Sequence, residues 1–393
     1  MTTRLKQVGL AALLTTLSAF PALSQPSDSA LLSAFRWRNI GPASMGGRVV
    51  DIEALDSAFT TVYVASASGG VFKSVNAGTT WTPIFDNYAS ASIGDIAVFQ
   101  ANPRIVWVGT GEANNRNSVA WGDGVYKSTD EGRTFRNTGL RTTHQISRIV
   151  THPSNPDIVY VAAIGHLWGY SGDRGLFRTS DGCATWTKLG GGLPNDGRAG
   201  ATELVMDPSN PSVLYTAFYH RLRKPWTFTS GGPNGGIFKS TDAGATWKKL
   251  STGLPNGPTG RIGLAISRQN PQILMAIVEA EQTNDLARPG SGIYRSEDGG
   301  NSWRYVNTYN NRPFYYSQIR INPLDHQRVY VLTTRFMVSA DGGKTLRNGS
   351  ADEEIHGDFH AMWLDPKNAN RYYIGADKGS SLTHDHGATF TLF

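Results

Sequence analysis

Apolar and polar residues alternate in short runs along the chain. Clear examples are Gly70-Val71-Phe72-Lys73, Gly124-Val125-Tyr126-Lys127 and Gly236-Ile237-Phe238-Lys239. A period of two is typical of strands with one buried face, whereas an amphipathic helix has a period of about 3.6 residues. Residues that favour turns, namely Gly, Asn, Asp and Pro, separate these runs. The pattern predicts an all-β protein made of many short strands.

One motif, Ser/Thr-x-Asp-x-Gly-x-Thr-Trp, follows such a run again and again. The acidic position of its seven copies falls at Asn76, Asp130, Asp181, Asp242, Asp298, Asp341 and Asp385. Neighbouring copies are 43 to 61 residues apart, which fits one four-stranded blade for each copy. The sequence therefore predicts a β-propeller of seven four-stranded blades, either as a closed ring or as an arc of a larger propeller.

The residue types of this motif are those of a turn. The Asp or Asn side chain accepts hydrogen bonds from backbone N–H groups of the turn, and Gly adopts the positive φ that the turn requires. We therefore interpret the seven copies as scaffold rather than as catalytic or calcium-binding sites. Cys183 stands where the third copy should have Gly, which predicts a strained turn, with a reactive thiol as the alternative.

A second signature, an Asn-Pro turn followed by a strand, precedes four of the copies, beginning at Asn102, Asn155, Asn210 and Asn270. Each unit then contains a strand, this turn, two strands, the motif and a fourth strand. We assign residues 48–393 to the propeller on this basis. In a closed ring the first and last blades would touch, and we predict that the strand-like segment Phe35–Ile40 lies near the last blade.

The N-terminus has the order of a secretory signal peptide. Arg4 and Lys6 precede an apolar stretch from Val8 to Phe20, and small residues follow it. This stretch is shorter than the roughly 20 residues that a membrane-spanning helix needs. We predict a signal peptide over residues 1–24 and a lead-in segment over residues 25–47, with a membrane anchor as the alternative. The mature protein is expected in the periplasm or outside the cell, without a membrane span.

Composition and charge exclude several functions. The formal net charge of +6 falls to +4 without Arg4 and Lys6, and no run is rich in Lys or Arg, so a nucleic-acid partner is not expected. Cys183 is the only cysteine, which excludes an intrachain disulfide. The sequence has no Walker loop, Gly-x-Ser-x-Gly elbow, His-Glu-x-x-His or Cys-x-x-Cys motif. We therefore expect no cofactor.

The repeats resemble those of the Asp-box (BNR) superfamily, which includes sialidases, sortilin-type receptors and xyloglucan-cleaving glycoside hydrolases. The chain is most similar to exported bacterial proteins with a sortilin-like propeller, over residues 36–393. The segments that carry the resemblance are RWRNIGPASMGGRV from Arg36, GTGEANNR from Gly109, GHLWG from Gly165, PWTFTSGGPNGG from Pro225, RPFYYS from Arg312 and HGDFHAMWLDP from His356. Such proteins usually continue with further blades, so both a truncated form and a minimal ring remain open.

The resemblance also bears on catalysis. Xyloglucan-cleaving enzymes carry a catalytic Asp in a Thr-Asp-x-Gly-Gly segment that corresponds to residues 66–70, where Ala67 replaces the acid. Acids remain at comparable strand ends, namely Glu112, Glu279 and Asp377. Glu112 and Asp377 are the candidate catalytic pair, since inverting hydrolysis needs two carboxyl groups about 6.5–9.5 Å apart. The alternative is that these acids only bond neighbouring loops or an arginine.

Loops after the second strands meet at one mouth of a propeller channel, where ligands are expected to bind. The residues predicted to contact a ligand there are Arg116, His166, Trp168, Trp226, Tyr315 and Tyr316. Packing between blades is the alternative for the aromatic ones. Asp358 and His360 alternate with His356 and are predicted to line the same mouth, with a metal site as the alternative.

These observations give three hypotheses. The first is an exported propeller that binds a peptide or a glycan at the mouth, because the scaffold is complete but Ala67 replaces the acid. The second is a glycoside hydrolase that acts on β-glucan or xyloglucan. The third is an assembly or sorting factor with a protein partner.

Overall fold

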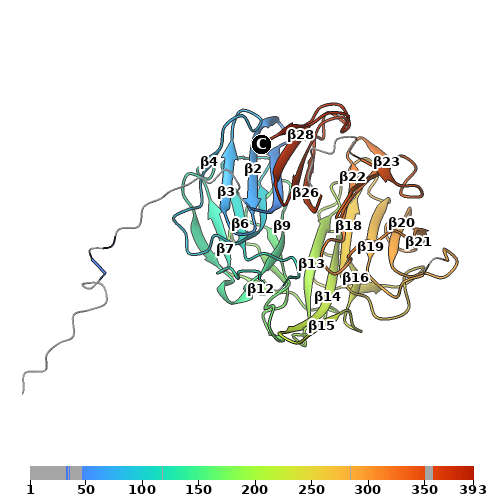
Figure 1. Ribbon diagram of the computed structural model, residues 1–393. Coiled ribbons are helices and arrows are strands. Elements are labelled where there is room, and N and C mark those ends of the chain that lie inside the picture. The colour runs from blue at the N-terminus through green and yellow to red at the C-terminus, as the bar shows by residue number, and fades with distance from the viewer. Residues whose placement is uncertain (1–31, 34, 36–46, 117, 284, 350–356) are drawn as a thin grey trace, which may run out of the picture. The chain divides into compact units, whose positions relative to one another are not determined.

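The computed structural model describes residues 32–33, 35, 47–116, 118–283, 285–349 and 357–393 (Figure 1). The chain divides into two units, Met1–Ala43 and Ser44–Phe393. In the first unit only three residues are described, and a turn links the Phe35 amide to the Leu32 carbonyl at 2.9 Å. The predicted signal peptide and the segment after Phe35 that was expected near the last blade lie outside the described residues.

The second unit is a ring of seven antiparallel blades, as the repeats predict (Figure 1). Blade 1 contains β1 (Val49–Leu55), β2 (Ala58–Ser66), β3 (Gly70–Ser74) and β4 (Thr82–Pro83). Blade 2 contains β5 (Ile93–Val98), β6 (Val106–Thr110), β7 (Val125–Ser128) and β8 (Arg136–Gly139). Blade 3 contains β9 (Ile146–Thr151), β10 (Val159–Ala163), β11 (Gly175–Thr179) and β12 (Thr187–Lys188). Blade 4 is β13 (Ala199–Met206), β14 (Leu214–Lys224), β16 (Gly236–Ser240) and β17 (Lys248–Leu250), and β15 (Thr227–Ser230) extends it by pairing with β14.

Blade 5 contains β18 (Ile262–Ile266), β19 (Leu274–Val278), β20 (Gly292–Ser296) and β21 (Arg304–Asn307). Blade 6 contains β22 (Gln318–Asn322), β23 (Asp325–Leu332), β24 (Phe336–Ser339) and β25 (Arg347–Asn348). Blade 7 contains β26 (Phe359–Leu364), β27 (Tyr372–Ala376), β28 (Gly379–Thr383) and β29 (Thr391–Leu392). A short 3-10 turn spans Arg141–Thr143. No helix among the described residues has the length and apolarity needed to cross a membrane.

The ring closes between blades 7 and 1. Val49 and Ile52 of β1 share one hydrophobic cluster with Trp363 of β26 and Tyr373 of β27. The Tyr373 hydroxyl also donates to the Phe59 carbonyl at 3.1 Å. Each blade is made of consecutive residues, so side-chain packing rather than a shared strand joins the two ends of the ring. The chain is thus a closed ring and not an open arc.

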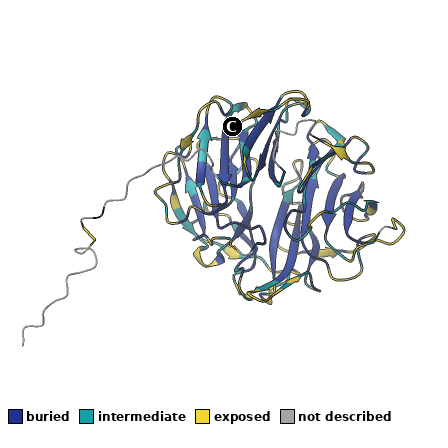
Figure 2. Cartoon of the chain, viewed as in Figure 1, coloured by how far each residue is buried: buried dark blue, intermediate teal, exposed yellow. Residues whose placement is uncertain are grey.

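Hydrophobic clusters between successive blades form the core. Figure 2 shows that the strands are mostly buried and that exposed residues lie mainly in the loops. Polar contacts reinforce the packing at the Asp-box end. In blade 4, the Tyr215 hydroxyl and the Lys239 ammonium group both donate to the Gly299 carbonyl of blade 5, at 2.8 and 2.6 Å. The Asp-box turn of blade 5 therefore also bridges neighbouring blades.

The Asp boxes have the expected turn geometry. In the second box, Asp130 accepts the Thr134 hydroxyl at 2.6 Å and the Thr134 amide at 2.9 Å, and these hydrogen bonds lower the pKa of Asp130 to about 2. Two successive residues then have positive φ, Glu131 at 64° and Gly132 at 83°. Cys183 occupies the second of these positions in the third box with φ of 80°. A non-glycine residue in this conformation is strained, as the sequence predicts.

Candidate functional site

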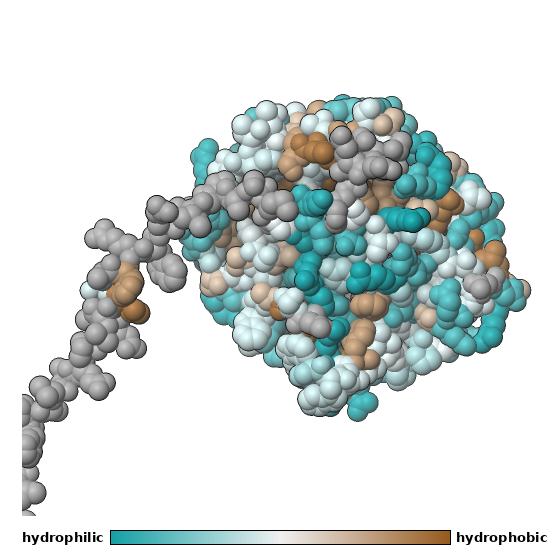
Figure 3. All heavy atoms as spheres, viewed as in Figure 1, coloured by the Kyte–Doolittle hydropathy of each residue, from teal (hydrophilic) through white to brown (hydrophobic). Residues whose placement is uncertain are grey.

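The predicted site residues all come from one end of the ring. Because each blade is antiparallel, the connections between its second and third strands open opposite to the Asp boxes, as do the connections between blades. We call this end the upper mouth and the Asp-box end the lower mouth. Hydrophilic residues gather over the centre of the ring on the face that Figure 3 shows, and hydrophobic residues are scattered. This face therefore suits a polar ligand better than a broad apolar partner.

The loop between β6 and β7 crosses the upper mouth. It begins in blade 2, but its Glu112 contacts Arg48 of blade 1, with Oε1 and Nη2 2.5 Å apart. Its Asn114 accepts Arg261 Nη2 from the start of blade 5 at 3.1 Å. The next residue, Asn115, donates to the Tyr219 hydroxyl of blade 4 at 3.1 Å, and only 1% of it is exposed. We call this segment the crossing loop, and it links blade 2 to blades 1, 4 and 5.

The candidate catalytic acids meet at one guanidinium group. Arg48 contacts Glu112 through Nη2 and Asp377 Oδ1 through Nη1 at 3.8 Å. Two carboxyl groups that contact the same guanidinium group lie within the upper limit of roughly 9.5 Å for the carboxyl groups of an inverting enzyme. Glu112 is only 2% exposed, whereas a third of the Asp377 side chain is exposed.

Their surroundings give the two acids opposite pKa shifts. Burial raises the pKa of Glu112, although the charges of Arg48 and Arg116 oppose this shift. Burial also acts to raise the pKa of Asp377, but the His360 hydrogen bond and the charge of Arg48 outweigh it, so that this pKa is lowered. His360 Nε2 lies 2.9 Å from Asp377 Oδ1. Glu112 is therefore the better proton donor of the pair, and Asp377 the better acceptor.

The predicted residues around His360 form a packed cluster in the wall. Tyr316 stacks on the His360 ring, and its hydroxyl donates to Asp358 Oδ1. Tyr315 meets His360 edge to face, and both tyrosines are buried. Burial lowers the pKa of His360 to about 4. His356 lies outside the described residues, and within the described part of the chain no three His, Cys, Asp or Glu residues are grouped to hold a metal ion.

Two exposed tryptophans and two half-buried histidines lie in the upper-mouth loops of blades 2 and 3. Trp121 of the crossing loop lies against His144, with ring centroids 5.4 Å apart, and His144 stacks on His166 at 3.6 Å. Trp168 follows on the same loop as His166, and 46% of it is exposed. We call these four residues the aromatic row. Trp121 was not predicted, although its place in a loop after a second strand matches that of Trp168.

The other predicted residues lie on the β14–β15 hairpin, in the crossing loop and after β19, and the hairpin meets the aromatic row through a bridge between Arg223 and Trp168. Trp226, at the tip of the β14–β15 hairpin, is 78% exposed and has the Lys224 ammonium group 5.8 Å from its ring. Arg116 lies in the crossing loop, where its charge contributes to the pKa of both candidate acids. Glu279 accepts the Ser230 hydroxyl at 2.6 Å and the Arg261 amide at 2.7 Å. Glu279 thus has bonds to its neighbours that need no ligand.

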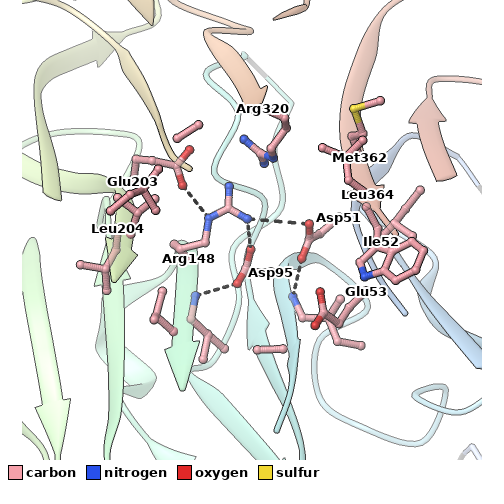
Figure 4. A pocket seen from close by; sticks show the side chains of 18 of the residues that line it. Asp51, Ile52, Glu53, Asp95, Arg148, Glu203, Leu204, Arg320, Met362 and Leu364 are labelled. Carbon is pink, nitrogen blue, oxygen red and sulfur yellow. Dashed lines mark hydrogen bonds and ion pairs between the residues drawn. The ribbon is translucent and has the colours of Figure 1, made fainter. Parts of the chain in front are cut away.

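A charged cavity, which the sequence did not lead us to expect, opens from the lower mouth (Figure 4). It has a volume of about 400 Å³ between the first strands of the blades. Arg148 lies at its centre, with Nη1 2.8 Å from Asp95 Oδ1 and Nε 2.6 Å from Glu203 Oε1. Asp51 lies 3.8 Å from Arg148 Nη1, and Arg320 approaches from the other side.

The acids of this cavity also join neighbouring blades. Asp51 accepts the Ile96 amide at 3.1 Å, and Asp95 accepts the Ile149 amide at 2.6 Å. Burial raises the pKa of both carboxyl groups, against the charge of Arg148. The cavity is therefore a network of coupled charges at the axis of the ring.

Known sequences resemble this chain in part. The family model described as Sortilin-Vps10 (sortilin, neurotensin receptor 3) matches residues 123–285. A xyloglucanase from Paenibacillus sp is 24% identical, over 80% of this chain and 37% of its own length. The chain thus spans less than half of that relative.

Solved structures have the same fold. The GH74 xyloglucanase from Xanthomonas campestris superposes with a TM-score of 0.65 at 16% identity, over 89% of this chain and 54% of that chain. The structure of YCF48 bound to D1 peptide gives a TM-score of 0.57 at 13% identity, over 87% of this chain and 94% of that chain.

Proposed function

Since the chain is a sortilin-like and xyloglucanase-like β-propeller, we propose that it is an exported protein that binds a glycan through the aromatic row of its upper mouth. The stack of Trp121, His144 and His166 is the observation that carries this proposal. Aromatic faces with polar edges suit sugars, which have both C–H faces and hydroxyl groups. The relatives named as xyloglucanases support a glycan, and the neighbour bound to a peptide makes a peptide the second ligand class for these loops.

Replacing Trp121 or Trp168 by alanine is expected to weaken glycan binding about tenfold or more, because each change removes an exposed stacking surface. Isothermal titration calorimetry of the mature protein with xyloglucan and β-glucan oligosaccharides would measure this change. Val75→Ala is the control, since the exposed Val75 side chain lies in the first Asp box, at the other end of the ring. The proposal fails if wild-type protein binds none of these sugars, and binding to a peptide panel instead would favour the second ligand class.

A second candidate function is glycoside hydrolysis with Glu112 as acid and Asp377 as base. The contact of both acids with Arg48 and their opposite pKa shifts favour it. Glu112 is buried, so a substrate would reach it only after the crossing loop moves.

If this second function is present, wild-type protein releases new reducing ends from β-glucan or xyloglucan, and Glu112→Gln lowers the rate at least a hundredfold. A polysaccharide panel assayed for reducing ends tests it. Glu279→Gln is the control, because Glu279 is held by Ser230 and the Arg261 amide. Equal rates for wild type and Glu112→Gln would exclude Glu112 as the acid.

A further inference from the structure

The charged cavity of the lower mouth has its acids on one side. Strand pairing places Asp51, Asp95, Arg148 and Glu203 at the same level of blades 1 to 4. Each pairs with an alanine or glycine of the second strand, which in turn pairs with the third-strand residue three positions before the Asp box. Blades 5, 6 and 7 have Gly263, Gln318 and Ala361 at this level. No carboxylate therefore comes from these three blades at the level of the charge network.

Arg320 enters the cavity from this uncharged side. It lies in β22 of blade 6, and its guanidinium group is directed toward that of Arg148 in Figure 4. Its one hydrogen bond among the described residues goes from Nη1 to the Ile319 carbonyl at 2.9 Å. None of the ion pairs within the described part of the chain includes Arg320. Its remaining N–H donors therefore face the cavity.

Arg148 also presents a donor to this space. Its contacts with the three acids use Nε and Nη1, and Nη2 points toward Arg320 in Figure 4. Two guanidinium groups that face each other repel. Burial, and after it the charge of Arg148, lowers the pKa of Arg320. A negative ligand between the two groups would remove this repulsion and accept the unused N–H donors.

We propose that the cavity binds a small oxyanion, a carboxylate or a phosphate, between Arg148 and Arg320. The volume of about 400 Å³ admits a small organic acid as well as an inorganic anion. This site differs from the aromatic row, because it opens at the other end of the channel and uses none of the same residues. If the protein failed to bind glycans, the proposal of an anion site in this cavity would still stand.

Titration of the whole propeller with inorganic phosphate and with succinate, at constant ionic strength, tests the proposal and separates the two ligand classes. At least one probe is expected to bind at millimolar concentration or below, and Arg320→Met is expected to raise its dissociation constant about tenfold or more. Arg320→Lys keeps the charge but loses the planar fork, so we expect an intermediate value. Arg268→Met is the control, because Arg268 lies at the rim and pairs with Asp56 at 2.9 Å.

A measurement on the unchanged protein covers the case in which Arg320→Met does not fold. Crystals soaked in selenate should show an anomalous peak between Arg148 and Arg320. The absence of binding by both probes at millimolar concentration, or equal affinity in wild type and folded Arg320→Met, would overturn the proposal. A selenate peak elsewhere, without one at this position, would also overturn it.

Discussion

Replacing Arg148 by methionine is expected to lower the free energy of unfolding by about 3–5 kcal/mol. The change removes the positive charge that holds Asp95, Glu203 and Asp51 together, with contacts of 2.8, 2.6 and 3.8 Å. Methionine keeps much of the side-chain volume, so the loss reflects the charge rather than a cavity. The remaining carboxylates would repel one another at the axis of the ring, where blades 1 to 4 meet.

Urea denaturation monitored by tryptophan fluorescence would measure this loss as a lower midpoint. The combined change Arg148→Met with Glu203→Gln is the matched control, since it removes one of the unpaired carboxylates, and we expect it to recover part of the stability. Glu203→Gln alone should cost less than Arg148→Met, because Arg148 keeps Asp95 and Asp51 as partners. Equal midpoints for wild type and Arg148→Met would mean that the network contributes nothing to the stability of the ring.

The sequence was sufficient for the architecture because each blade repeats the same local signals. The Asp box requires two residues with positive φ, and the strand before it alternates, so each copy marks the third and fourth strands of one blade. The seven blades that these signals predict run from β1 at Val49 to β29 at Leu392. The fourth strands were harder to delimit, since several have only two residues, as in β12 (Thr187–Lys188).

The repeat predicts at which end of the ring the loops after the second strands lie, but not what their side chains contact. Its residues lie in loops that differ from blade to blade, so the repeat says nothing about their partners. The crossing loop shows this best, because Asn114 and Asn115 reach blades 5 and 4 rather than their own. Tyr315 and Tyr316 look like ligand-binding residues in the sequence, yet their rings are buried against His360. Only the fold decides which side of a loop faces the ligand.

The charged cavity could have been found in the sequence by comparing the blades in register. Asp95, Arg148 and Glu203 each stand seven residues before the Asn of an Asn-Pro turn, at Asn102, Asn155 and Asn210. A charged residue at one repeated position of an otherwise apolar inner strand indicates a charged level in the channel. Their pairing was not predictable, because it depends on which blades become neighbours around the axis.

Glu53 lies on the wall of the same cavity, one level closer to the lower mouth than Asp51. Its Oε1 accepts Gln100 Nε2 at 2.8 Å. Burial, and after it the charges of Asp51 and Asp56, raises the pKa of Glu53 to about 8. The folded protein therefore keeps a proton on Glu53 that the unfolded chain, with an ordinary carboxyl pKa near 4.5, has already released at neutral pH.

Replacing Glu53 by glutamine is expected to stabilise the protein increasingly as the pH rises. For an acid whose folded pKa is raised, stability is fully present below the unfolded pKa and is lost as the pH rises through the folded pKa. The wild type should thus lose stability between about pH 4.5 and pH 8, and Glu53→Gln should lack this loss while keeping an acceptor for Gln100. The difference in the free energy of unfolding should be close to zero at pH 4 and about 1–3 kcal/mol above pH 8, which is less than the full shift implies because the cavity opens to solvent.

Thermal denaturation of both proteins from pH 4 to pH 9 would measure this difference, with Glu131→Gln as the control, since half of the Glu131 side chain is exposed. If the stabilities of wild type and Glu53→Gln change with pH in the same way across this range, Glu53 ionises normally in the folded ring.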